Sequence, residues 1–189
     1  MKPFMFVSIC VTCLAIAGSL SAVPPPIGYI GIFKDATHNI ANPSVNTVCP
    51  ATYGSFEAWI WCLPSENGLQ AAEFAVSFPA TTVILGSVQN PLITITIGSL
   101  PDGISIAFSE GMCQMDWVWT HQFTMMLLDR AAAKIEIIPH PGTSPSPAYR
   151  FASCEYGYPI ELCIYLMPLS VCYPIGVEQA NWGAIKSLF

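Results

Sequence analysis

The sequence predicts an all-β protein, a disulfide-stapled antiparallel β-sandwich of the immunoglobulin-like or a similar kind. Three observations carry this prediction. Short apolar runs alternate with period two, as in strands that bury one face. Turn residues such as Asn90-Pro91 and Pro101-Asp102-Gly103 separate these runs at short intervals. Apolar runs of helical period that follow a capping residue are absent from the sequence, except near its end.

The chain begins with the features of a secretory signal peptide. One Lys is followed by an apolar run, Pro3 to Ala17, and then by small residues. The run is shorter than the roughly 20 residues that a membrane-spanning helix needs. We expect residues 1–22 to be cleaved, with no transmembrane segment after signal cleavage, residues 23–177 to form a single β-sandwich domain, and residues 178–189 to form a tail. The expected location is secreted, periplasmic or at the cell surface.

The composition is acidic and apolar. The chain has six Lys or Arg against twelve Asp or Glu, a formal net charge of −6, and 53% of its residues are hydrophobic. This balance provides no basic surface for a nucleic acid, so we expect no nucleic-acid partner. The length that remains after signal cleavage is sufficient for one well-buried domain.

The cysteines indicate disulfides, because their number after the predicted signal peptide is even and the chain is expected to be exported. We expect all of them to serve as disulfide cysteines, with at most one or two free thiols. If all pair, at least one of the last three must reach back to the first three, which closes a long loop worth about 3 to 5 kcal/mol. The pairing itself stays open. The residues are Cys49, Cys62, Cys113, Cys154, Cys163 and Cys172.

The clearest alternation marks the expected strands. In a strand over 56–62, the even-numbered residues share one apolar face and the odd-numbered residues share the other. A hairpin is expected over 92–108, with Ile93, Ile95 and Ile97 facing inward. Further strands are expected at 27–33, 72–78, 83–88, 133–139 and 160–167.

The segment from Cys113 to Asp129 places a thiol, a carboxylate and an imidazole close together in sequence. As a strand, it is expected to carry Trp117 and Trp119 on the same face as His121. Cys113 and His121 would lie roughly 26 Å apart in a straight strand, too far to share a metal ion. We therefore expect a core histidine that makes one hydrogen bond, and no metal site.

The best candidate for a binding surface is the pair Trp59 and Trp61 beside Glu57. If the opposite face of this strand is the core, the two indoles stand about 6.6 Å apart on the outer face. Adjacent indoles beside a carboxylate suit stacking against a sugar ring or a partner's apolar side chain. The alternatives are that these tryptophans face inward, or that the tail or a loop covers them.

The sequence contains no nucleophile elbow, zinc-protease motif or phosphate loop. We expect an exported non-catalytic module with a binding, adhesive or envelope-structural role and without cofactors, whose partner is a surface glycan or a protein. The alternative is a secreted hydrolase that uses Glu155, Glu161 or His140. In the tail, Trp182, Ile185 and Leu188 recur at helical spacing and predict a short helix.

Several segments resemble, in order, uncharacterised secreted bacterial proteins with β-sandwich-like domains. The segments are "IGYIGIF", a loop leading to Cys49, "EAWIWCLPSENGLQAAEFAV", "GSLPDGISIAFSEGMCQ", "KIEIIPHPG" leading to Cys154, and the terminal "VEQANWGAIKSLF". The resemblance covers most of the chain after the signal peptide and implies a secreted β-rich domain. Members of the family often carry paired cysteines just before the "KIEIIPHPG" segment, where this chain has alanines at 131–133. They also tend to end in Tyr-Arg, whereas this chain ends at Phe189. The family's disulfide pattern is therefore not transferred.

Overall fold

The computed structural model describes residues 27–38, 46–50, 54–129, 132–142, 148–155 and 157–172. The predicted signal peptide and the whole of the predicted tail, 178–189, with its expected short helix, lie outside these residues. Among the described residues all regular secondary structure is β-structure, which confirms the predicted fold class.

The described residues form twelve strands. Nine of them coincide with expected strands, and three short ones, β2, β10 and β12, were not expected. Their bounds are β1 Ile27–Phe33, β2 Thr47–Val48, β3 Ser55–Leu63, β4 Ala71–Ser77, β5 Thr82–Gln89, β6 Ile93–Ser99, β7 Gly103–Phe108, β8 Val118–Leu127, β9 Ala133–Ile138, β10 Arg150–Ala152, β11 Ile160–Tyr165 and β12 Leu169–Val171.

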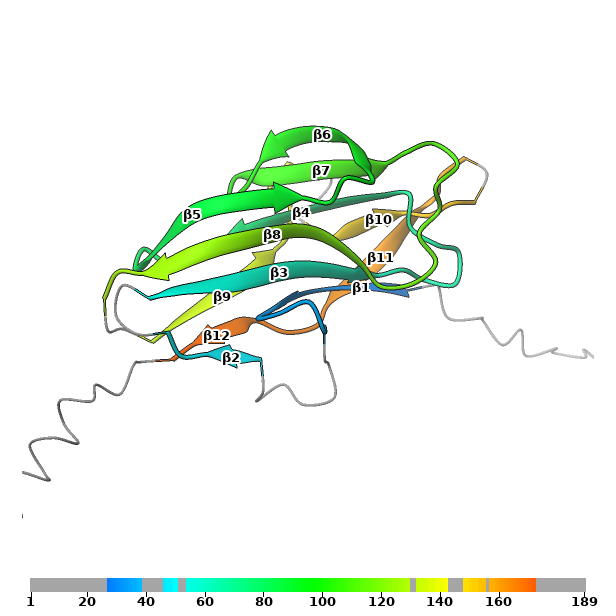
Figure 1. Cartoon of the computed structure of the whole chain (residues 1–189). Helices are drawn as coiled ribbons and strands as arrows, with labels where there is room; N and C mark the ends of the chain where they lie inside the picture. Colours follow the sequence, from blue (N-terminus) through cyan, green and yellow to red (C-terminus); the bar gives the residue numbers. More distant parts are fainter. Residues whose placement is uncertain are drawn as a thin grey trace, which may run out of the picture.

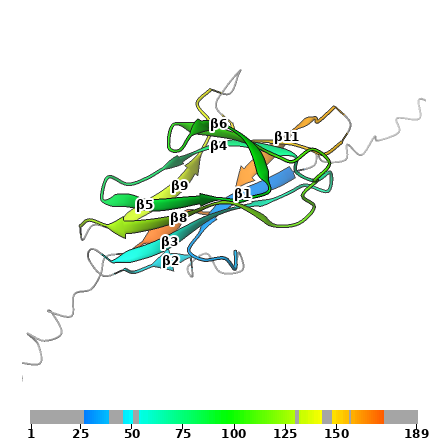
Figure 2. The same cartoon turned by 45° about the horizontal axis from the view of Figure 1, so that its top comes forward.

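The strands form two layers. One layer has the order β11-β1-β3-β8-β5, and the other contains β4 with β7 and β6 beyond it and β9, β12 and β2 along its second half. Figure 1 shows β5, β8, β3 and β1 side by side in front of β4, β9 and β10, and Figure 2 shows the same layers from above. The short strand β10 pairs with both β4 and β11 and so joins the layers. Most ladders are antiparallel as expected, but β1–β11 and β2–β12 are parallel.

The core lies between the two layers. Ile60 and Met125 from one layer and Phe74, Ile106 and Ile137 from the other are each at most 1% exposed. Each such side chain stabilises the fold by about 1.5 to 3 kcal/mol through removal of apolar surface from water. The inward-facing apolar side chains of β3, β7 and β8 therefore help to hold the two layers together.

The expected single face for Trp117, Trp119 and His121 is wrong. The β3–β8 ladder shifts register between Ile60, which pairs with His121, and Trp61, which pairs with Trp119. This bulge inserts one residue, so the side chains before it change face relative to those after it. His121 consequently lies in the core, as expected, whereas Trp117 and Trp119 lie on the outer face of the sheet.

A second bulge changes the faces that were expected for the isoleucines of the hairpin. Ile93 is buried, at 7% exposure, but Ile95 and Ile97 are 55% and 67% exposed. The β6–β7 ladder shifts register between Ile93 and Ile95, so the two later isoleucines point outward rather than inward. The returning strand follows the expectation, because Ile104 and Ile106 are buried.

Four of the cysteines form two disulfides. Cys49 pairs with Cys172 across 123 residues of sequence, and Cys113 pairs with Cys154 across 41 residues. Both bridges connect an early cysteine to one of the last three. In the chain-entropy model, loops of these lengths correspond to about 5 and about 4 kcal/mol of stabilisation.

The assignment of Cys62 and Cys163 to disulfides is wrong, since both are buried free thiols. β1 lies between their strands, with Ile30 opposite Cys62 and Gly28 opposite Cys163. Two strand spacings amount to roughly 9.6 Å, beyond the Cα separation that a disulfide spans. The expectation of at most two free thiols is confirmed for the six cysteines after the predicted signal peptide.

Candidate functional site

Four of the five tryptophans gather on the outer face of β1, β3 and β8. Strand pairing places Phe33 opposite Trp59, and it places Gly31, Trp61 and Trp119 in one row across the three strands. We call this surface the aromatic face. It consists of Phe33, Trp59, Trp61, Trp117 and Trp119, with Leu166 and Met167 packed against them.

The alternation of β3 creates this face as expected. Phe56, Ala58, Ile60 and Cys62 are at most 6% exposed and belong to the main core. Glu57 on the opposite side is exposed, and Trp59 is half-buried. The core assignment in the sequence analysis is therefore correct for this strand.

The expected pair of open indoles is not present, because Trp61 is only 8% exposed. The imidazole of His38 covers it, with the two ring centroids 4.4 Å apart. Gly31 lies opposite Trp61, and a Cβ there would approach the Phe33 ring to 2.9 Å, so the glycine makes room for that ring. One of the alternatives foreseen for the tryptophan pair, cover by a loop, therefore applies to Trp61.

His38 lies between two indoles. Its ring is 4.4 Å from that of Trp61 and 4.7 Å from that of Trp117, and its backbone has a left-handed φ of 41°. The preceding turn is fixed by Asp35, whose carboxylate accepts hydrogen bonds from the backbone N–H of Thr37 at 2.9 Å and from its hydroxyl at 2.5 Å. The hydroxyl bond is the main cause of a lowered pKa of Asp35, followed by the opposing effect of partial burial.

Asn46 fixes the other end of the loop that carries His38. Its side-chain amide donates to the carbonyl oxygens of Ile32 and Pro168, both at 2.7 Å, and its Oδ1 accepts from the Lys34 N–H at 3.1 Å. Asn46 is 4% exposed, so these bonds replace the water that a buried amide would lose. Side-chain hydrogen bonds of Asp35 and Asn46 thus fix the described residues on either side of the stretch that follows His38.

The accessible part of the aromatic face comprises the half-buried Trp59, Trp117 and Trp119. The Nε1 of Trp59 donates to Glu57 at 2.9 Å, and its ring meets that of Trp119 edge to face at 5.5 Å. The rings of Trp59 and Trp119 are inclined by 75°, so they do not form a flat platform. Such an uneven apolar surface with exposed carboxylates at Glu57 and Asp116 suits apolar side chains that pack beside the rings.

The binding surface predicted from the sequence does not include Trp117 and Trp119. A straight strand assigns them to the face of His121, and only the bulge in β8 moves them beside Trp59. The concentration of Trp residues at 59, 61, 117 and 119 was the available signal in the sequence.

His121 is a core residue without a role at this face. It is 6% exposed, its ring stacks on Phe123 at 6.1 Å, and burial lowers its pKa to about 4. Its Nδ1 is buried and has no hydrogen-bond partner among the described residues, so the one bond expected of it is not made at this atom.

The residues considered for a hydrolase lie in separate environments. Glu161 on β11 is 7% exposed and accepts hydrogen bonds from the Ser65 hydroxyl at 2.5 Å and the Asn67 amide at 2.7 Å. His140 lies against the turn at Gly103, whose added Cβ would be 2.9 Å from its Nε2. Glu161 thus has a structural role, since its two hydrogen bonds hold the turn at 64–68. It lies on a different element from His140.

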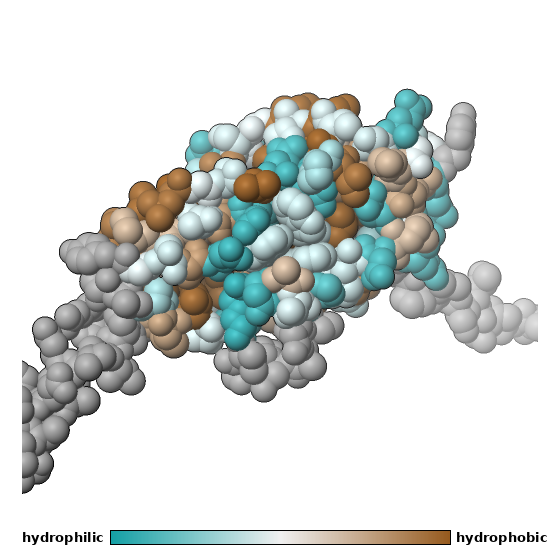
Figure 3. Space-filling model, viewed as in Figure 1, coloured by the Kyte–Doolittle hydropathy of each residue, from teal (hydrophilic) through white to brown (hydrophobic). Residues whose placement is uncertain are grey.

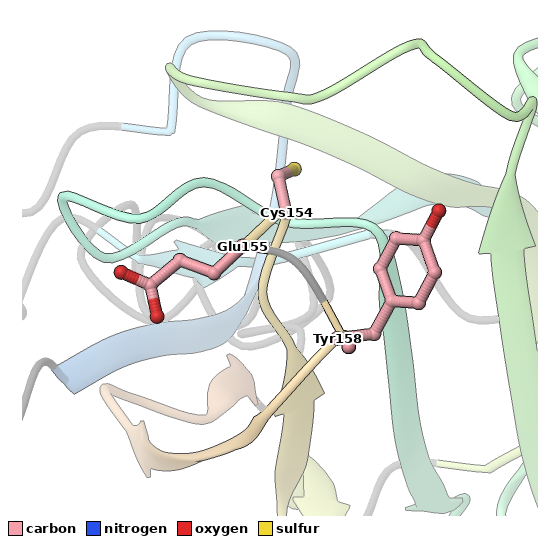
Figure 4. Close-up of a pocket in the computed structure, with 4 residues that line it drawn as sticks. Cys154, Glu155 and Tyr158 are labelled. Carbon is pink, nitrogen blue, oxygen red and sulfur yellow. The ribbon is translucent and has the colours of Figure 1, made fainter.

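Glu155 borders an open hollow of about 550 Å³ lined by Cys154, Gly157 and Tyr158. Figure 4 shows that the Glu155 carboxylate and the Tyr158 ring extend to opposite sides of the turn that carries them. The hollow therefore lacks the pair of facing acid and base groups that glycoside hydrolysis requires.

Neither a metal centre nor a membrane-crossing helix is found in the part of the chain that the structure describes. No group of three or more His, Cys, Asp or Glu side chains converges there to hold an ion. The same residues include no helix of the length and apolarity needed to cross a bilayer.

No protein-family model and no curated protein matches the sequence. Similar solved structures are cohesin modules. The sixth cohesin of scaffoldin B from Acetivibrio cellulolyticus, solved in complex with a dockerin, is 12% identical with a TM-score of 0.51 over 77% of this chain and 98% of that one. The cohesin module of a family 33 glycoside hydrolase from Clostridium perfringens is 9% identical with a TM-score of 0.52 over 78% and 98%.

The type III cohesin of the cell-surface anchoring scaffoldin ScaE from Ruminococcus flavefaciens gives a TM-score of 0.51 at 8% identity, over 79% of this chain and 88% of that one. At these identities the likeness concerns the fold. The chain thus has a β-sandwich fold similar to that of cohesin modules.

Proposed function

We propose that this protein is an exported, non-catalytic module that binds another protein through the aromatic face. The observation that carries the proposal is the gathering of Trp59, Trp117 and Trp119, partly exposed, on one outer sheet face. Tryptophan is the residue type most enriched among side chains that dominate protein interfaces. An outer sheet face that served only to meet water would carry polar residues at these positions.

Two features favour a protein partner over a glycan. The inclination of 75° between the Trp59 and Trp119 rings leaves no common plane on which successive sugar rings could stack. In addition, a cohesin module of similar fold was solved in complex with a dockerin, a protein partner. An inclined pair of indoles in edge-to-face contact can still pack apolar side chains beside the rings.

The export of the protein is supported by the amino-terminal signal features and by two disulfides, which persist in oxidising compartments. A hydrolytic role has weaker support, because Glu161 is engaged by Ser65 and Asn67 and the Glu155 carboxylate extends away from Tyr158. The module would act at the cell surface or in the envelope, where its partner is displayed.

The proposal is tested by binding of the fluorescently labelled protein to cells of the organism that produces it. Three cell samples are compared, one untreated, one shaved with protease and one oxidised with periodate to destroy glycans. We expect binding to be lost after protease treatment and retained after periodate treatment. Loss only after periodate treatment would overturn the protein partner in favour of a glycan.

Variants locate the binding surface in the same assay. The double variant Trp59→Ala/Trp119→Ala should weaken binding by at least about tenfold, since interface tryptophans typically contribute more than 1 kcal/mol each. Leu162→Ala on β11 is the control, because Leu162 is an exposed apolar residue, at 61%, outside the aromatic face. Equal binding by the double variant and the wild type would refute the proposed surface.

A further inference from the structure

The outermost strands β5 and β6 carry an exposed apolar surface at the edge of the sandwich. On β5 it shares the outer sheet face with the aromatic tryptophans, since Val88 lies in one row with Gln122 and Trp59. Among the described strands, β5 pairs only with β8 and β6 only with β7, so each has one unpaired backbone edge. A side-chain hydrogen bond of 3.1 Å from Thr96 to Gln89 links the two strands. We call this surface the β5–β6 edge. Its exposed large apolar residues include Val83, Leu85, Val88, Leu92, Ile95 and Ile97.

The β5–β6 edge is free of charge. The sequence has no Asp, Glu, Lys or Arg between Glu73 and Asp102, and neither strand contains a proline. Edge strands of soluble proteins are usually protected by such residues, because an open edge pairs with other strands. The two strands carry one bulge each, and the bulge in β6 turns Ile95 and Ile97 outward instead of shielding the edge.

The space-filling view supports the same surface. Figure 3 shows hydrophobic atoms gathered over the start of β5 and over β6, with hydrophilic and neutral atoms between and below them. Ile97 is 67% exposed and Ile95 55%, so each leaves more than half of its surface in contact with water in the monomer. Another surface that covered them would remove this apolar area from water, which is favourable.

We propose that the β5–β6 edge is covered by the same edge of a second copy of this chain, in a two-fold symmetric dimer. The net charge of −6 makes two copies repel wherever their acidic surfaces meet. The β5–β6 edge is a surface on which they approach without that repulsion, because it carries no ionised side chain.

The backbone geometry favours the same arrangement. Two identical edge strands related by a two-fold axis run antiparallel, so each can complete the unpaired hydrogen bonds of the other. The contact buries the exposed apolar side chains of both copies together, which contributes to the roughly 800 Å² per partner that a stable interface buries. The pairing requires no partner of different sequence.

The test is sedimentation velocity of the purified exported protein over a concentration series. The wild type should be dimeric, and Leu85→Lys/Ile97→Lys, with one charge on each strand, should be monomeric, its dissociation constant raised by at least about tenfold per substitution. The matched control is Ile160→Lys/Leu162→Lys on β11, whose side chains are 62% and 61% exposed. The control should remain dimeric.

A monomeric wild type, or equal loss of the dimer in both double variants, would overturn the proposal. Hydrogen exchange of the wild type gives a second reading, because dilution to the monomer should speed exchange in the amides of β5 and β6 alone. Protection that changes in other strands would place the contact elsewhere. Neither result depends on the aromatic face, so this proposal and the protein-binding function can fail separately.

Discussion

The indole N–H of Trp59 donates a 2.9 Å hydrogen bond to the carboxylate of Glu57, its neighbour two residues earlier on the same face of β3. The bond orients the indole edge toward an acid and leaves part of the ring exposed beside Trp119. Because both residues lie on the solvent side of the sheet, the bond shapes the surface more than it stabilises the fold.

We expect Glu57→Ala to weaken binding to untreated cells several-fold, while Glu57→Gln, which keeps an acceptor for the indole, should retain most of it. The unfolding free energy should change by less than about 0.5 kcal/mol in both variants, as is usual for exposed positions. Cell-binding titration and urea denaturation measure the two quantities. A large loss of stability in Glu57→Ala would assign the residue to the fold rather than to the surface.

Trp59→Ala and Trp61→Ala should differ sharply in stability. Trp61 is 8% exposed and packed among Phe33, Met167 and His38, so its truncation should cost about 3 kcal/mol or more. Trp59 is half-buried, and its truncation should cost less than half as much. Urea denaturation compares the two variants, and similar losses would contradict the distinct environments of these neighbouring indoles.

Thiol titration of the exported protein should find two reactive thiols after unfolding without reductant, those of Cys62 and Cys163. In the folded protein neither should react readily, since burial raises the pKa of both thiols and shields them from reagent. Mass spectrometry of the labelled, digested protein identifies the sites. Labelling at Cys113 or Cys154 would show that their bridge is absent.

Stability should fall as the pH is lowered from about 6.5 toward 4. The pKa of His121 is about 4 in the folded state, below its ordinary value of 6.5, because the ring is buried. In this window the unfolded chain binds a proton that the folded chain does not, so acid favours unfolding, by at most about 3 kcal/mol. The stability is fully present above the unfolded value and is lost as the pH approaches 4.

His121→Leu should remove this pH dependence between pH 6.5 and 5, where carboxylates contribute little. Urea denaturation at several pH values measures the slope in the variant and the wild type. An unchanged slope in His121→Leu would show that another group is responsible.

The fold class was predictable because the strands obey a period of two and are separated by turn residues. The face of each residue in β3 followed from that period, as Phe56 and Ile60 demonstrate. The face predicted from this period is wrong where a bulge adds a residue to a strand. Neither the bulge before His121 nor the one after Ile93 is indicated by the residues around it. Both bulges are features of the pairing between strands, which the alternation within one strand does not reveal.

The candidate site was predictable in part for the same reason. Glu57 and Trp59 are where the alternation placed them, whereas Trp117 and Trp119 reached the aromatic face through the bulge in β8. The cover on Trp61 depends on His38, which is distant in sequence and held by a turn with a left-handed residue. Contacts of this kind depend on loop conformation, for which the sequence offers no periodic signal.

Oxidative footprinting of the protein bound to producing cells tests the central claim most directly. Hydroxyl radicals label exposed aromatic rings, and mass spectrometry compares labelling in the bound and free protein. We predict that labelling of Trp59, Trp117 and Trp119 falls on binding, while that of Tyr158, which is 50% exposed and is not part of the aromatic face, stays constant. Unchanged labelling of the three tryptophans in the bound protein would contradict the aromatic face as the binding surface.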